Sequence, residues 1–196
     1  TKPFMPWYDT TVGALKFRNA ADTAWVSAIE AVGGSQSMNF RNRIYNGDMR
    51  INQRAAGTVT INSTTAGFCV DRFQGQGESA LGAFSMQQST DAPAGFNNSL
   101  LLTVTTADAA LSGSTVNYSL AHILEGLAVA DMGFGTSSAQ TITLSFWVKS
   151  SLTGAMGGVV SNSQGTSMRA YGYLYTINAA NTWEYKTITV PGDTTG

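Results

Sequence analysis

The sequence predicts an all-β fold, an antiparallel β-sandwich preceded by a short N-terminal arm. Thr, Ser and Gly together make up about a third of the 196 residues, a composition that favours strands and turns over helices. Apolar and polar residues alternate with a period of two in many runs after residue 58, as they do in half-buried strands. Clusters of Gly, Asn, Asp, Ser and Pro separate these runs and indicate turns.

Residues 1–35 are predicted to form the arm. From residue 7 onward its aromatic residues recur around short polar turns at 9–11 and 19–22, and they are Trp7, Tyr8, Phe17 and Trp25. A helix over 20–31 is an alternative to short strands, because alanine is frequent there and Asp22 or Thr23 could cap it. A segment this small cannot bury two tryptophans and a phenylalanine, so we expect it to pack against another chain or domain. Gly33, Gly34 and Ser35 then predict a flexible link.

Residues 36–196 are predicted to form the second part, which begins with a basic segment at 36–57. The clearest strand is 141–149, where one face carries Ile142, Leu144, Phe146 and Val148. Further alternating runs lie at 58–61, 98–106, 117–126, 168–177 and 182–192. Turn clusters lie at 91–95, 112–114, 133–135, 154–158 and 178–181. About nine short strands at this spacing indicate an antiparallel sandwich.

The composition excludes several classes of protein. Hydrophobic residues make up 43% of the chain, which is too apolar for a disordered protein. The formal net charge of −1 argues against a nucleic-acid partner bound through a basic surface. No apolar run approaches the roughly 20 residues needed to span a bilayer, so we expect no membrane insertion. The single cysteine, Cys69, excludes an internal disulfide and a cysteine-based zinc site.

Several segments resemble the jelly-roll, carbohydrate-binding-module-like domain of bacteriophage tail fibres and other virion proteins. In chain order they are RIYNGDMRINQRAAG at 43–57, CVDRFQG at 69–75, NSLLLTVTTAD at 98–108, YSLAHILEGL at 118–127, TLSFWVKSS at 143–151 and TINAANTWEYKTITVPGDTTG at 176–196. The arm sequence WYDTTVGALKFRNAADTAWV at 7–26 more loosely resembles segments that precede such domains. The resemblance implies an antiparallel β-sandwich of the jelly-roll type and a homotrimeric assembly. It also leads us to expect that the domain continues beyond residue 196.

The residue types that could carry catalysis do not form a recognisable set. His122 lies in an alternating run, and we expect a core or interface histidine rather than a general base. Two carboxylates could serve glycoside hydrolysis, but nothing in the spacing of Asp71, Asp108, Glu125, Asp131 and Glu184 singles out a pair. No glycine-rich run has the spacing of a phosphate-binding loop. We therefore predict that the chain is not an enzyme.

Three sets of residues are candidates for binding. Tyr171, Tyr173 and Tyr175 share one strand face and, with Trp147, could stack on sugar rings, although they could equally fill a core or a subunit contact. Arg41 and Arg43 belong to the basic segment together with Arg50 and Arg54, and with the arm aromatics they are candidates for an assembly interface. A solvated face and local bonds to Asp48 and Asp71 are the alternatives. We expect no catalytic cofactor. The resemblance suggests one structural calcium ion, for which the nearest oxygen ligands are Asn46, Asp48 and Asp71.

These observations lead to one functional hypothesis, one alternative, and a third hypothesis that the chain is itself a hydrolase. The hypothesis is a structural protein of a bacteriophage virion, a tail-fibre or receptor-binding subunit that is made in the host cytoplasm and assembled into the tail or fibre. Its partners would be copies of itself, other virion proteins and a host surface glycan. The alternative is the carbohydrate-binding module of a secreted polysaccharide-degrading enzyme. Jelly rolls serve many functions, so the fold alone does not choose between them.

Overall fold

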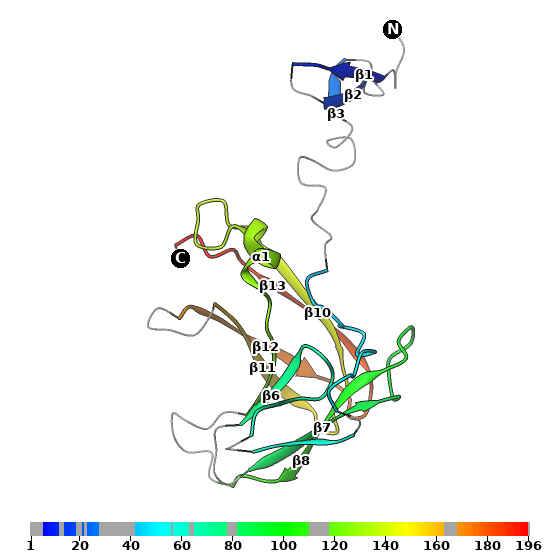
Figure 1. Ribbon diagram of the computed structural model, residues 1–196, viewed down its shortest axis with the longest axis vertical. Coiled ribbons are helices and arrows are strands. Elements are labelled where there is room, and N and C mark those ends of the chain that lie inside the picture. The colour runs from blue at the N-terminus through cyan, green and yellow to red at the C-terminus, as the bar shows by residue number, and fades with distance from the viewer. Residues whose placement is uncertain are drawn as a thin grey trace. The chain divides into compact units, whose positions relative to one another are not determined.

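Figure 1 shows the computed structural model of the protein, which describes residues 6–11, 14–18, 21, 23–27, 42–55, 57–62, 65–77, 82–109, 118–162 and 168–195. The chain divides into two units, Thr1–Asn42 and Arg43–Gly196, and each is described by itself. Every ladder among the described residues is antiparallel, which confirms the predicted all-β, antiparallel fold class. The predicted boundary between residues 35 and 36 lies outside the described residues.

The N-terminal unit contains a three-stranded antiparallel meander of β1 (Pro6–Asp9), β2 (Ala14–Arg18) and β3 (Trp25–Ser27). Asp9 organises the turn after β1, because its carboxylate accepts a hydrogen bond from the Thr11 backbone N–H at 3.0 Å. The same carboxylate pairs with the Lys16 ammonium at 2.7 Å on the neighbouring strand. Residues 25–27, for which the sequence allowed either a strand or a helix, form the short strand β3. Residues 28–31 and the predicted link at 33–35 lie outside the described residues.

We call the second unit, Arg43–Gly196, the body. Two three-stranded sheets form its first part. Their strands are β4 (Val59–Ile61), β7 (Ala83–Ser89) and β8 (Ser99–Thr106) in one sheet, and β5 (Gly67–Phe68), β6 (Phe73–Gly77) and β9 (Tyr118–His122) in the other. The apolar side chains that they bury form the core: Ile61, Cys69, Val70, Phe73, Phe84 and Met86. Gly75 lies in the middle of this core, where a Cβ atom would come within 2.8 Å of Ile61 and Met86.

Two strand pairs form the second part of the body (Figure 1). They are β10 (Ile142–Val148) with β13 (Glu184–Val190), and β11 (Gly154–Ser161) with β12 (Ala170–Ile177). In β10 the predicted apolar face is half-buried and the opposite face is exposed, as the alternation predicts. Pairing is nested, because β6 pairs with β9 around the β7–β8 hairpin and β10 pairs with β13 around β11–β12. Nested antiparallel pairs are compatible with Greek-key folds, while the complete jelly-roll connectivity stays a prediction.

Two local predictions are wrong. The cluster 154–158 is not a turn but the beginning of β11. At Gly158 a glycine suits the strand, because the Tyr173 ring of β12 occupies the space that a side chain would need. The predicted strand 117–126 ends at His122 and is followed by a one-turn helix α1 (Gly126–Val129) and a 3₁₀ turn η2 (Ala130–Met132). No helix in the described part of the chain has the length and apolar character that crossing a membrane requires.

Candidate functional site

The three tyrosines of β12 lie on one strand face, and that face points inward. Tyr173 and Tyr175 are half-buried, and burial raises the pKa of both phenols. The Tyr175 ring packs edge-to-face against Phe146 of β10, with 5.1 Å between the ring centroids. Tyr175 therefore joins the β11–β12 pair to the β10–β13 pair by aromatic packing.

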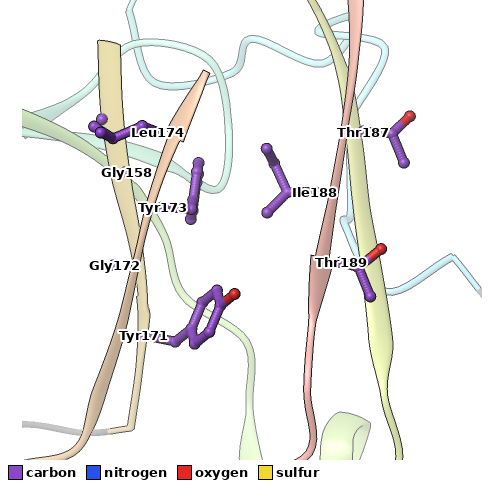
Figure 2. A pocket seen from close by; sticks show the side chains of 9 residues that line it. Gly158, Tyr171, Gly172, Tyr173, Leu174, Thr187, Ile188 and Thr189 are labelled. Atoms are coloured by element: carbon purple, nitrogen blue, oxygen red, sulfur yellow. The ribbon is translucent and has the colours of Figure 1, made fainter. Parts of the chain in front are cut away.

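A cleft of about 790 Å³ separates these two strand pairs. Figure 2 shows Tyr171 and Tyr173 on one wall pointing toward Ile188 on the other wall, whereas Thr187 and Thr189 point away. Gly158 opens space for Tyr173, because a Cβ atom at this glycine would lie 2.7 Å from Cε2 of the tyrosine ring. The geometry favours packing over sugar stacking for the tyrosine face, with Tyr171 at its more exposed end.

Trp147 lies on the opposite, outer face of β10. It faces Tyr185 across the β10–β13 ladder, with 5.4 Å between the ring centroids and an angle of 54° between the planes. Trp147 is 41% exposed and Tyr185 is 55% exposed. The four aromatic residues that the sequence grouped as sugar contacts are thus divided between two faces. Tyr185 was missed because its partner depends on strand register, which the sequence pattern does not reveal.

Asp91 holds the loop between β7 and β8 against the adjoining ends of β10 and β13. Its carboxylate pairs with the Lys149 ammonium and accepts a hydrogen bond from the Trp183 indole N–H at 3.2 Å. The pKa of Asp91 is lowered, mainly by the hydrogen bond from Lys149 and then by the one from Trp183. Lys149 also lies 5.4 Å from the centroid of the Trp183 ring. This cluster was not anticipated from the sequence, since its members are far apart in the chain.

The described carboxylates with shifted pKa values are all shifted downward. Lys186, at 2.6 Å, and the backbone N–H groups at the β12–β13 turn lower the pKa of Glu184 to about 2. Arg169 lowers the pKa of Asp193 to about 2, and Arg72 lowers that of Glu125. A general acid at neutral pH needs a raised pKa, so these groups are suited to holding loops rather than to transferring protons.

His122 is held by packing and by one hydrogen bond. Its Nε2 donates to the Tyr45 carbonyl oxygen at 3.0 Å, and its ring packs edge-to-face on Phe73 with 4.8 Å between centroids. Glu125 does not orient it but pairs with Arg72 at 2.7 Å. Arg72 adopts a left-handed backbone conformation with φ of 79°, and its guanidinium lies 5.4 Å from the Tyr45 ring centroid. The arrangement fits the core or interface histidine that the sequence predicts.

The basic segment makes contacts within the body. The Arg43 guanidinium donates to the Ala128 carbonyl oxygen and pairs with Asp131 at 2.5 Å, leaving the Arg43 side chain only 13% exposed. Arg54 lies over the Phe68 ring, with 5.0 Å from its guanidinium carbon to the ring centroid. The other predicted interface arginine, Arg41, lies outside the described residues. These contacts favour a local structural role for Arg43 over the predicted docking role.

The three residues proposed for calcium have protein partners in the structure. The Asn46 amide donates to the carbonyl oxygens of Ile51 and Asp71 at 2.9 and 3.0 Å. The Asp71 carboxylate accepts a hydrogen bond from the Gln53 backbone N–H, and Asp48 lies 3.8 Å from an arginine. Among the described residues, no group of three or more His, Cys, Asp or Glu side chains could hold a metal ion.

The arm aromatics occupy both faces of the small N-terminal sheet. Trp7 and Trp25 share one face, with 5.4 Å between their ring centroids. Lys16 lies over the Trp7 ring at 5.9 Å, and Arg18 lies over the Trp25 ring at 5.3 Å. By strand alternation the opposite face carries the other apolar residues, which are Pro6, Tyr8, Leu15, Phe17 and Val26.

Comparison with known proteins does not assign a family. No protein-family model matches the chain, and neither the curated proteins nor the solved structures compared with it give a significant match. Function is therefore inferred from the geometry of the arm, from that of the body and from the sequence resemblance.

Proposed function

We propose that the protein is a structural component of a bacteriophage virion, a tail-fibre or receptor-binding subunit that assembles as a homotrimer. The arm joins copies of the chain to one another and to other virion proteins, and the body is the outward module. The sequence resemblance and the antiparallel β architecture support this proposal. The paired, low-pKa carboxylates support a structural role over a hydrolytic one.

The observation that carries the proposal is the lack of a core in the described arm. Asp9, a polar residue, is the buried side chain in that part of the chain, whereas Trp7 is 46%, Tyr8 57% and Leu15 43% exposed. A three-stranded sheet with so little buried apolar area has almost no hydrophobic stabilisation of its own. Tyr8 and Leu15 form a cross-strand pair on one face of the sheet. An exposed apolar pair of this kind marks an interaction surface, and copies of the same chain would cover it in a closed assembly.

Sedimentation of the full chain tests the proposal. We expect a particle of about three times the 20.7 kDa chain mass, and a Tyr8→Ser/Leu15→Ser variant that dissociates toward the monomer. The matched control is Tyr185→Ser, which removes an equally exposed aromatic from the body and leaves the trimer intact. A wild-type chain that stays monomeric at high concentration would remove the support for the assembly role of the arm.

The alternative, a carbohydrate-binding module of a secreted enzyme, is favoured by one observation, the exposed Trp147–Tyr185 pair on the body. A module of this kind works as a monomer beside a catalytic domain. Polysaccharide binding by a chain that sediments as a monomer would therefore favour the alternative over the fibre subunit.

A further inference from the structure

The outer face of the β10–β13 pair carries a continuous row of exposed side chains, which we call the outer strip. Three cross-strand pairs form it: Thr143 with Thr189, Ser145 with Thr187, and Trp147 with Tyr185. All six residues are exposed, and their side chains lie opposite one another on one face. Alternate residues along a strand are about 6.8 Å apart, so the three rows span about 14 Å.

One end of the outer strip is aromatic and the rest is hydroxylic. The tilted rings of Trp147 and Tyr185 expose apolar surface, and Trp147 adds an indole N–H donor. The next two rows expose four hydroxyl groups, each of which can donate and accept a hydrogen bond. A matching ligand therefore combines a flat apolar face with several hydroxyl groups.

The charges at the aromatic end of the strip neutralise each other. Lys149 follows Trp147 on the same strand face, and its ammonium is paired with the Asp91 carboxylate. Asp91 is held in turn by the Trp183 indole N–H. A charged ligand would lose hydration here without gaining a free counter-charge, so the strip favours an uncharged ligand.

We propose that the outer strip binds a neutral oligosaccharide, with one sugar ring against the Trp147–Tyr185 row and the neighbouring hydroxyls bonded to the Ser and Thr rows. This inference rests on the proposed function and deepens it, since it names the ligand class of the outward module. It also moves the sugar site away from the tyrosines of β12, because Tyr173 and Tyr175 pack inside the body. The strip is open and shallow, so a single site binds weakly, in the millimolar to micromolar range that is about 4 to 8 kcal/mol.

The test uses the full chain and affinity electrophoresis through gels that contain soluble neutral polysaccharides (a β-glucan, an α-glucan, a mannan and a galactan) or anionic polygalacturonate. Calorimetry with oligosaccharides of the retarding polymer then gives the affinity. We expect retardation by at least one neutral polymer and none by polygalacturonate. Trp147→Ala and Tyr185→Ala are each expected to weaken binding about tenfold, because each removes apolar contact area with the sugar.

Tyr171→Ala is the matched control, because Tyr171 is 39% exposed but lies on the cleft side of the body. It should leave the affinity unchanged, and circular dichroism shows that each variant is folded. Three results overturn the inference: no retardation by any neutral polymer, loss of binding in Tyr171→Ala but not in Trp147→Ala, and a change in sedimenting mass of Trp147→Ala with binding unchanged. The last result would make the strip a subunit contact. The first two results leave the sedimenting mass unchanged, and the third changes it in the Trp147→Ala variant but not in the wild-type chain, so failure of this inference and failure of the proposed function are measured separately.

Discussion

Replacing Tyr175 with alanine should destabilise the body, and replacing Tyr185 should cost about half as much stability. Both are tyrosines in the second part of the body, but Tyr175 faces the interior and Tyr185 faces solvent. If the tyrosine face of β12 were a sugar-binding surface, the two substitutions would have similar effects on stability. The pair of variants therefore tests the assignment of faces on which the site depends.

The size of the effect follows from burial. Truncating a fully buried aromatic residue to alanine costs about 3–5 kcal/mol, and Tyr175 is half-buried, so we expect about 2 kcal/mol. That loss corresponds to a decrease in Tm of about 4–8 °C for a domain of this size. Tyr185→Ala loses only the aromatic pair with Trp147, which is worth about 1 kcal/mol, or about 2–4 °C.

Urea unfolding followed by circular dichroism measures both variants, with the m-value showing whether the unfolded states are comparable. Tyr175→Phe is a further control that keeps the ring against Phe146 and removes only a hydroxyl that lies 3.8 Å from the Met156 sulfur. It should be close to wild type. If Tyr185→Ala lost as much stability as Tyr175→Ala, the division of the body into an inner tyrosine face and an outer strip would be wrong.

Three further changes probe other parts of the body. Gly75→Ala should lose about 1–3 kcal/mol by overpacking against Ile61 and Met86, whereas Gly57→Ala, with no atom near its Cβ position, should be neutral in the same urea titration. Because the pKa of Glu184 is lowered from 4.5 to about 2, the contribution of its ionised carboxylate to stability is complete above pH 4.5 and is lost as the pH falls toward 2. In Glu184→Gln the Tm should therefore decline less over that interval than in the wild type, and an equal decline would contradict the stabilising role of the carboxylate. Arg43→Ala should speed hydrogen exchange of the amides in α1, since the arginine holds the Ala128 carbonyl; exchange at the wild-type rate would show that this contact does not hold the helix.

The sequence predicted well those elements whose signal is local. Alternation in 141–149 identified the strand and its two faces, because one half-buried face leaves a period-two pattern whatever the strand pairs with. It failed at 154–158, where glycine enrichment indicated a turn. The glycine at 158 lies in a strand because the ring of Tyr173 occupies the space of its missing side chain. That requirement comes from a cross-strand neighbour and leaves no local signature.

The candidate site was only partly predictable for the same reason. Side-chain alternation along one strand correctly placed Trp147 on the face of β10 opposite its apolar face. It could not show which way the tyrosines of β12 point. Their direction depends on how the two strand pairs pack, and Tyr185 joins Trp147 only through the register of β10 with β13. Clusters such as Asp91 with Lys149 depend on loops meeting across long sequence separations, which strand periodicity does not encode.

The low content of charged residues in the chain bears on the proposed roles of both the outer strip and the arm. Charged residues make up 12% of the chain, and several of the described carboxylates form ion pairs that hold loops and strand ends. The outer strip is left with hydroxyl and aromatic groups. A surface of this kind recognises an uncharged ligand weakly, because it has neither a free charge nor a deep pocket. Copies joined through their arms would present several such strips at once, and the high effective concentration of the second and third strips compensates for weak single contacts. In the proposed assembly the strip therefore determines which surface is recognised, and the arm determines how firmly the particle is held to it.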